Sequence, residues 1–322
     1  MKIKSITNLY AALACALTLG LMPAIGAAEA AFEQLYIFGD SLSDPGNAYA
    51  LSGQTSKAPY QAIPESEAPY AIGGHHFSNG KTWAERLAQN LNANNSGKPA
   101  VENPGRYGNY AFGGARARDS GTSPTSSAQV GMFLGNHGTA PSDALYVLEF
   151  GGNDIRDALF DPDPVSVIVS AVAAEIGNIY TLYFSGARNF AIANAPDLSR
   201  TPAVVAAGPG AVAGAYALSS FHNDILEYGL APIGLPGLEQ LELLLPGIKI
   251  YRIDLFGFIN DVADNPAAFG ISDPFFPCLL FDVKSEAKCD NPDERMFWDG
   301  IHPTAVIHSA LGDVATAIVT IN

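Results

Sequence analysis

The sequence predicts an α/β protein built on a central five-stranded parallel sheet with helices on both faces. Five short apolar segments, rich in β-branched and aromatic residues, recur between longer stretches whose apolar residues repeat at helical spacing. This alternation is typical of parallel sheets that are covered on both faces. The chain of 322 residues is 48% hydrophobic and 15% charged, which excludes a disordered protein and provides for a sizeable core.

The expected elements follow one another along the chain. Strands are predicted at residues 35–38, 100–102, 145–150, 189–193 and 248–253, of which 100–102 is the weakest. Helices are predicted at residues 82–92, 165–185, 203–228, 238–245, 258–263 and 304–320. Residues 48–80 and 115–142 are expected to be long irregular connections, a length typical of loops that serve binding. No internal repeat or flexible linker divides the chain, so residues 31–322 are expected to form one domain.

The N-terminus has the three parts of a secretory signal peptide. A basic start, an apolar stretch over residues 9–25 and an alanine-rich region with cleavage after Ala28 or Ala30 follow one another. A membrane anchor is the alternative, but Pro23 interrupts the apolar stretch, which is short for the roughly 20 residues that span a bilayer. We therefore expect residues 1–30 to be removed, and the mature protein to be secreted or periplasmic without a transmembrane segment.

The charge and the cysteines of the chain limit its partners and its compartment. Removing residues 1–30, which hold two lysines and one glutamate, changes the formal net charge from −15 to −16. Nucleic acids and anionic membrane surfaces are therefore poor candidate partners. The mature chain keeps Cys278 and Cys289 as its only cysteines, and an oxidising compartment favours a disulfide between them. A pair of zinc ligands is the alternative, but no other cysteine or histidine lies at ligand spacing.

Ser41 lies where the first expected strand ends, within the turn-forming segment 39–47. Ligands of open α/β sheets bind at the carboxyl edge of the strands, so a serine at this place is positioned for chemistry. The same residue types also form ordinary turns, which leaves a structural role open. A serine hydroxyl needs a base and an orienting group to act as a nucleophile, and Asp299 and His302 provide both on one loop.

Two further segments contain donors for the oxyanion of a tetrahedral intermediate. Asn153, in the segment 151–154 after the third expected strand, can present its amide at the same sheet edge as Ser41. In the segment 109–115 after the second expected strand, a glycine lets a backbone N–H approach a substrate closely. Each segment is turn-like when taken alone. Their occurrence at successive strand ends favours a single site.

These four segments together resemble the GDSL, or SGNH, hydrolase superfamily. The nucleophile, glycine, asparagine and histidine blocks of that family correspond in order to residues 39–47, 109–115, 151–154 and 299–302. Residues 187–198, 260–266 and 278–298 further resemble its secreted lipase and esterase branch. Phe112 departs from the pattern, because members often have a small residue there, and it predicts a narrower pocket beside the oxyanion hole. A Gly-x-Ser-x-Gly motif is missing, which argues against the ordinary α/β-hydrolase family.

The resemblance implies a three-layer α/β/α sandwich of the flavodoxin-like type and an acyl-enzyme mechanism that needs no metal or cofactor. Carried over residue by residue, Ser41 is the nucleophile, His302 is the general base and acid, and Asp299 orients His302. The oxyanion hole then combines the backbone N–H of Ser41, the backbone N–H of Gly114 and the side chain of Asn153. Gly113 stays an alternative to Gly114.

The other histidines and a C-terminal aromatic cluster are expected to have structural roles. His75 and His76 are predicted to be solvent-exposed in a polar loop, whereas His137, His222 and His308 are predicted to be structural. The aromatic cluster is expected to be mostly core, and part of it could line an acyl pocket. It comprises Phe256, Phe258, Phe269, Phe275, Phe276, Leu279, Leu280 and Phe281.

The sequence therefore predicts a serine carboxylic ester hydrolase of the esterase, lipase or lysophospholipase type, acting on a small-molecule or lipid ester. A carbohydrate O-acetyl esterase and an acyltransferase would use the same site, and both stay open. A catalytically silent surface or carbohydrate-binding module is the alternative of another class. The complete set of nucleophile, base, orienting carboxylate and oxyanion donors argues against it.

Overall fold

The computed structural model describes residues 32–52, 75–230, 241–279 and 289–321. The expected signal peptide, Leu280 and Phe281 lie outside the described residues. Within the described part, four strands form one parallel sheet in the order in which they occur along the chain. These strands are β1 (Leu35–Gly39), β2 (Leu145–Glu149), β3 (Asn189–Ala193) and β4 (Lys249–Ile253).

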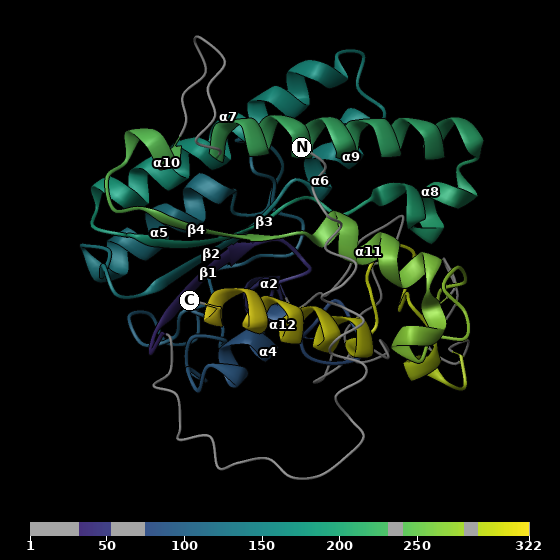
Figure 1. Cartoon of the computed structure of the whole chain (residues 1–322), viewed down its shortest axis with the longest axis horizontal. Coiled ribbons are helices and arrows are strands. Elements are labelled where there is room, and N and C mark those ends of the chain that lie inside the picture. Colours follow the sequence, from purple (N-terminus) through teal and green to yellow (C-terminus); the bar gives the residue numbers. More distant parts are fainter. Residues whose placement is uncertain (1–31, 53–74, 231–240, 280–288, 322) are drawn as a thin grey trace.

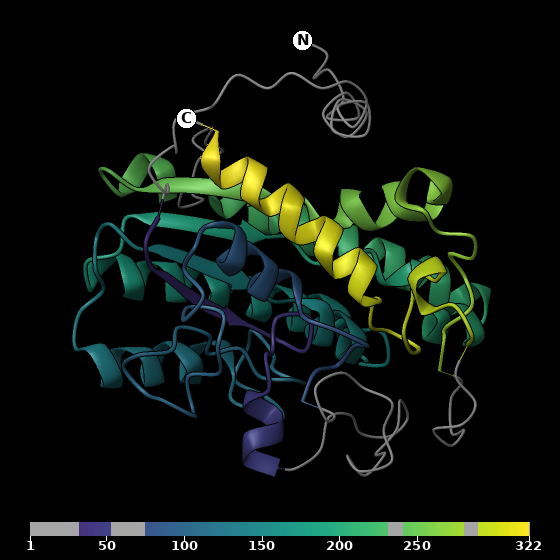
Figure 2. The ribbon, with the colours of Figure 1, turned by 90° about the horizontal axis from the view of Figure 1, so that it is seen from below.

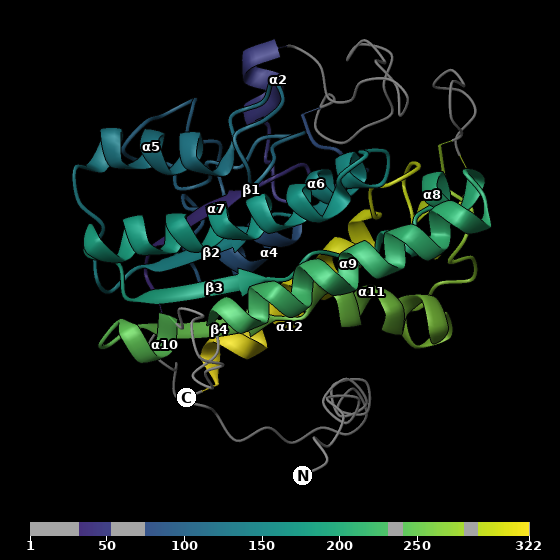
Figure 3. The ribbon, with the colours of Figure 1, turned by 90° about the horizontal axis from the view of Figure 1, so that it is seen from above.

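The sheet lies between two layers of helices, which confirms the predicted α/β class (Figure 1). Because successive side chains of a strand point to opposite faces, Ile37 and Val147 pack with one layer, and Phe38 and Leu148 with the other. The first layer contains α4 (Trp83–Asn90), α11 (Leu255–Asp264) and α12 (Ala305–Thr320), with α12 crossing the sheet in Figure 2. The second contains α5 (Ser126–His137), α7 (Pro164–Phe184), α9 (Pro209–Leu230) and α10 (Leu241–Leu244), seen from above in Figure 3.

The first helical layer is held in place by an N-terminal cap and a close helix contact. Thr82 and Glu85 form a capping box at the start of α4, in which each side chain accepts from the other residue's backbone N–H. Gly312 of α12 lies so close to α4 that a Cβ there would be 2.8 Å from the Trp83 carbonyl oxygen. The layer therefore packs tightly beneath the strand ends that carry the predicted site.

The prediction of a fifth strand at residues 100–102 is wrong, because the sheet of the described residues has four strands. Residues 100–102 form turns. The segment that reaches the free edge of β1 lies further along the chain, where the Tyr110 N–H donates to the Ile37 carbonyl and Ile37 N–H to the Gly108 carbonyl. Pro99 and Asn109 form only an isolated bridge, in which the Asn109 N–H donates to the Lys98 carbonyl and the Ala100 N–H donates to the Asn109 carbonyl.

The remaining differences concern helices in segments expected to be loops or a single helix. The expected loops contain α2 (Asn47–Ser52) and α5, while α6 (Gly152–Ala158) begins inside the asparagine block. The expected helix 203–228 is divided into α8 (Pro202–Ala206) and α9, because Gly208 has a φ of +97° that interrupts helical geometry. Short 3₁₀ turns complete the described elements at Leu198–Arg200, Pro266–Phe269 and Pro292–Glu294.

Helix α7 differs from the expectation that no segment after the signal peptide could span a membrane. By length and composition its 21 residues could do so, since a stretch of them has a mean hydropathy of 1.6. In the structure its residues Ala171, Ile179 and Leu182 are buried in the core between the sheet and α9. Its apolar character is therefore used for packing within the domain.

Candidate active site

Ser41 lies two residues after the end of β1, in a turn that hydrogen bonds hold at the carboxyl edge of the sheet. The Asp40 carboxylate accepts from the Leu42 N–H at 2.9 Å, and the Asp40 carbonyl accepts from the Ser43 N–H. Gly39 is needed at the strand end, because a Cβ there would lie 3.0 Å from the Glu149 carbonyl oxygen. Ser41 itself retains 9% of its surface exposure, so its hydroxyl is buried but reachable.

The loop before α12 places Asp299 and His302 against Ser41. One Asp299 oxygen accepts from the backbone N–H groups of Ile301 and His302, which holds the carboxylate inside its own turn. The other oxygen lies 2.7 Å from His302 Nδ1, and His302 Nε2 lies 2.9 Å from Ser41 Oγ. With its proton on Nδ1, the imidazole donates to Asp299 and accepts from the serine hydroxyl. The serine can therefore pass its proton to His302 as it attacks a carbon.

Asp299 is ionised over the ordinary pH range despite its burial. Burial alone would raise the pKa of this carboxyl, but the charge of His302 and hydrogen bonds from His302 and two backbone N–H groups outweigh it. The pKa of Asp299 consequently lies below its usual value. A permanent negative charge beside Nδ1 stabilises the imidazolium that proton transfer from Ser41 would produce.

The glycine block is tied to the nucleophile block through Asp44. The buried Asp44 carboxylate accepts from the Gly113 N–H at 2.8 Å and from the N–H groups of Gly46, Asn47 and Ala48. Among the described residues, the Gly114 N–H has no hydrogen-bond partner and the Ser41 N–H has none either. The structure therefore leaves Gly114, rather than Gly113, with a donor available for a substrate.

The Asn153 side chain reaches the same place from α6, with both of its amide hydrogens engaged. Its Nδ2 donates to an Asp40 oxygen at 3.0 Å and to the Ala115 carbonyl at 2.9 Å. To stabilise an oxyanion, one of these hydrogens has to turn toward the substrate. Its Oδ1 accepts from Arg156 Nη1 at 3.0 Å. Because arginine only donates, this contact sets which side of the amide faces Ser41.

Arg156 was not among the residues predicted for the site. It follows Asn153 by three residues, a spacing that places two side chains on the same face of a helix, so the helical start of the asparagine block was the available signal. Ion pairs brace the same region, since Asp157 binds Arg116 bidentately, at 2.9 and 2.8 Å. This pair holds the end of the glycine block against α6 and keeps Gly114 beside Asn153.

Two buried carboxyl groups, Asp40 and Glu149, lie close to Ser41. Glu149, the last residue of β2, pairs in register with Gly39 and is fully buried next to Asp40. Burial and the Asp40 charge raise the pKa of Glu149 well above its usual value, and burial also raises the pKa of Asp40. Two adjacent buried carboxyls do not both ionise readily. Asp40 accepts from Asn153 Nδ2 at 3.0 Å. One Glu149 oxygen accepts from the Ser43 hydroxyl at 2.9 Å.

A mostly apolar cleft opens at Ser41 and His302 and runs into the layer of α4, α11 and α12. It encloses about 670 Å³, part of it open to solvent. Its apolar walls include Leu42, Trp83, Leu255, Phe258, Phe297, Ile307 and Leu311. The predicted narrowing by Phe112 is wrong, because that side chain is buried in the core on the opposite face of the sheet. Of the predicted aromatic cluster, Phe258 lines the cleft, whereas Phe275 and Phe276 are exposed.

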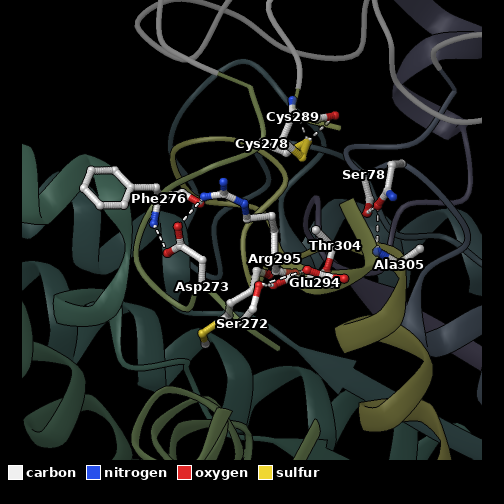
Figure 4. Close-up of a disulfide and its surroundings, with 12 residues drawn as sticks. Ser78, Ser272, Asp273, Phe276, Cys278, Cys289, Glu294, Arg295, Thr304 and Ala305 are labelled. Atoms are coloured by element: carbon white, nitrogen blue, oxygen red, sulfur yellow. Dashed lines mark hydrogen bonds and ion pairs between the residues drawn. A yellow bond between two sulfur atoms is a disulfide. The ribbon is translucent and has the colours of Figure 1, made fainter. Parts of the chain in front are cut away.

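Cys278 and Cys289 are joined by a disulfide beside the loop that carries Asp299 and His302 (Figure 4). The Cys278 N–H donates to the Phe297 carbonyl, two residues before Asp299. An ion pair between Asp273 and Arg295 joins the same two segments. The disulfide therefore holds the segment that leads into the loop of Asp299 and His302. Neither cysteine lines the cleft.

Three of the remaining histidines, His76, His222 and His308, are buried, although His76 was expected to be exposed. His76 is buried, with Nε2 2.7 Å from a Glu85 oxygen, because the loop folds back onto the start of α4. His222 pairs with the buried Glu175 at 3.1 Å, and His308 accepts from the Trp83 N–H. The described residues contain no group of three or more His, Cys, Asp or Glu side chains that could hold a metal ion.

Comparisons with known proteins agree with this arrangement. The sequence profile described as GDSL-like Lipase/Acylhydrolase matches residues 35–315. A phosphatidylcholine-sterol acyltransferase of Aeromonas hydrophila is 26% identical over 345 aligned residues, covering 90% of each chain. A GDSL esterase/lipase of Arabidopsis thaliana is 25% identical and covers 88% of this chain and 83% of its own. Lipase 1 of Photorhabdus luminescens is 30% identical over 178 aligned residues. These cover 54% of this chain and 24% of the lipase.

The family profile spans most of the chain and includes all four blocks that carry the site. Ser41, the glycine block, Asn153 and His302 all fall within the matched residues 35–315. The chain is a member of the GDSL-like lipase and acylhydrolase family, and thus a hydrolase of ester bonds.

Proposed function

We propose that the protein is an exported serine carboxylic ester hydrolase that works through an acyl-enzyme on Ser41. The observation that carries the proposal is the chain of hydrogen bonds from Ser41 through His302 to Asp299, at 2.9 and 2.7 Å. Ser41 attacks the ester carbonyl while His302 takes its proton. His302 then gives that proton to the leaving alcohol, and a water molecule activated by His302 releases the acid from Ser41.

The oxyanion of each tetrahedral intermediate is stabilised by three donors around Ser41. The backbone N–H groups of Ser41 and Gly114 are without partners among the described residues, which supports their role. Asn153 contributes its amide when one hydrogen turns from its ground-state acceptor to the developing charge. No step of this sequence requires a metal or an organic cofactor.

The apolar walls of the cleft support acyl groups longer than acetyl. An acyl chain attached to Ser41 can lie against Leu42 and Ile301, the partly exposed apolar residues of the cleft, where each buried methylene contributes about 0.8 kcal/mol. A carbohydrate O-acetyl esterase would gain nothing from these walls. Acyl transfer to a second alcohol is the other candidate function, supported by the acyltransferase name of the relative from Aeromonas hydrophila.

An acyl-length series of p-nitrophenyl esters, measured on the wild type and on Ser41→Ala, tests the proposal. We expect the rate to be greatest at medium or long chains and to fall at least 10³-fold in Ser41→Ala. Ser170→Ala, which changes an exposed serine of α7, is the matched control and should retain wild-type rates. Unchanged turnover in Ser41→Ala would refute the mechanism, and a preference for acetyl alone would favour the O-acetyl esterase.

Export is proposed from the N-terminal sequence and agrees with the disulfide. We propose cleavage after Ala28 or Ala30, release into the periplasm or the medium, and a single hydrolase domain over residues 31–322. The intact mass of protein recovered outside the cytoplasm should correspond to a chain that begins at Glu29 or Ala31 and contains one disulfide. A protein that retains Met1 and has three free thiols would contradict both proposals.

A further inference from the structure

A second hollow lies beside the catalytic cleft, on the surface between α6 and α8. This groove encloses about 880 Å³, much of it open to solvent, and Arg156, Asp157, Leu159, Phe160, Asp161, Ala203, Val204 and Ala207 line it. Five of these residues are apolar and three are charged. Phe160 has 79% of its surface exposed and so presents an apolar ring at the groove.

The groove shares one lining residue with the catalytic cleft. Arg156 lines both, and Thr201, which lines the cleft, begins the helix α8 that forms the groove wall. The Ala203 N–H donates to the Gly300 carbonyl at 2.9 Å, within the loop that carries Asp299 and His302. Figure 3 shows α6 and α8 at the same end of the molecule. A ligand bound in the groove would therefore extend toward Ser41.

Two cavities on either side of Arg156 would have different chemical tasks in an acyl-enzyme mechanism. The acyl group stays bonded to Ser41 until water arrives, so it suits the apolar cleft, where Leu42 and Ile301 are partly exposed beside Ser41. The alcohol has to accept a proton from His302, leave, and make room for water. An open surface groove next to the His302 loop allows this exit.

We propose that the groove between α6 and α8 is the subsite for the alcohol part of the substrate, and that this alcohol carries an apolar chain. Leu159, Phe160 and Val204 bind the chain, and Arg156 lies at the junction beside the scissile ester. The proposal rests on the ester hydrolase function proposed above. It names the substrate class as esters that are apolar on both sides of the carboxyl group.

The test is a series of butanoate esters of methanol, butanol, pentanol and hexanol, kept below the concentrations at which they aggregate and followed by acid release. For the wild type, we expect kcat/KM to rise between butanol and hexanol by about two- to fourfold per methylene, the upper value corresponding to full burial. Phe160→Ser should reduce this slope, and Ala207→Trp, which places an indole in the groove from an exposed position, should flatten it. Before the slopes are compared, each kcat/KM value is divided by the kcat/KM of the same enzyme on the methyl ester.

Phe184→Ser is the matched control, because Phe184 is 77% exposed, as Phe160 is, but lies at the far end of α7 away from the groove. It should retain the wild-type slope. A flat alcohol series in a wild type that hydrolyses the methyl ester would overturn the groove while leaving the ester hydrolase intact. No turnover of any ester would instead remove the proposed function itself. An Ala207→Trp enzyme whose acyl-length dependence, rather than alcohol dependence, is lost would reverse the two subsites and overturn the proposal.

Discussion

Replacing Asp299 by asparagine would exchange one carboxylate oxygen for an amide nitrogen and reverse the direction of the hydrogen bond between residue 299 and His302 Nδ1. The oxygen that accepts from the Ile301 and His302 backbone N–H groups, at 2.9 and 2.8 Å, must remain a carbonyl oxygen in the variant. The amide nitrogen then takes the other position, 2.7 Å from His302 Nδ1. Because that nitrogen only donates, Nδ1 has to become the acceptor and the imidazole proton moves to Nε2.

The consequence for catalysis follows from the 2.9 Å contact between Nε2 and Ser41 Oγ. A protonated Nε2 cannot accept the serine proton, so the predominant tautomer of the variant has no general base. We expect kcat to fall by about 10³- to 10⁴-fold, equal to about 4 to 5 kcal/mol of transition-state stabilisation. The fold should change little, since the two backbone hydrogen bonds to residue 299 are retained.

Initial rates on p-nitrophenyl butanoate and the unfolding midpoint, measured on wild type and Asp299→Asn, test this reasoning. Asp313→Asn makes the same chemical change in a surface ion pair with Arg86 and should retain full activity. A loss in Asp299→Asn of less than tenfold, with the fold intact, would refute the role of Asp299 in setting the His302 tautomer. A large loss accompanied by unfolding would refute the prediction that only the tautomer changes.

Three further outcomes are expected. Replacing Cys278 and Cys289 by serine opens a loop of about 12 residues and should lower the free energy of unfolding by about 3 kcal/mol, measured by denaturant titration; an unchanged midpoint would contradict this. Burial lowers the pKa of His308 to about 3, so between pH 6.5 and 3 the unfolded chain binds a proton that the folded chain does not. The stability advantage of the wild type over His308→Asn should therefore shrink by about 1.4 kcal/mol per unit as the pH falls from 6 to 4, and a constant difference would argue against a neutral buried imidazole. Arg156→Leu removes the donor to the Asn153 carbonyl oxygen and should lower kcat on a methyl ester about tenfold, with partial recovery in Arg156→Lys, whereas an effect on KM alone would indicate a role only in binding.

Much of the sheet could be predicted from local sequence. Residues 189–193 form a strand with the predicted bounds, and the other three strands of the described sheet differ from prediction by one residue at an end. Runs of β-branched and aromatic residues between turn-forming residues indicate strands that are buried on both faces of a sheet. This pattern can be recognised within a few consecutive residues. The prediction of a strand at residues 100–102 was wrong because the edge of β1 is occupied by another segment, the glycine block. Which segment pairs with β1 depends on contacts between residues far apart in the chain.

Helix α5 shows a second limit of local sequence. Its serines and glycines have weak helix propensity, and the segment was expected to be a loop. The structure stabilises it by the Thr125 N-cap and by burial of Phe133 against Tyr36 of β1. His76 is similar, because only the fold brings it to Glu85 and removes it from solvent.

By itself, the sequence determined the fold class and the identity of the polar residues at the strand ends. Strand burial and turn formation depend mainly on residues that are close together in the sequence. It also named Ser41, Asp299 and His302 as one candidate set, and the structure places them in hydrogen-bonding distance. Only the tertiary structure decided that Gly113 is engaged by Asp44 while the Gly114 donor is available. Such choices depend on atoms supplied by segments far apart in the chain, and no local pattern contains their distances.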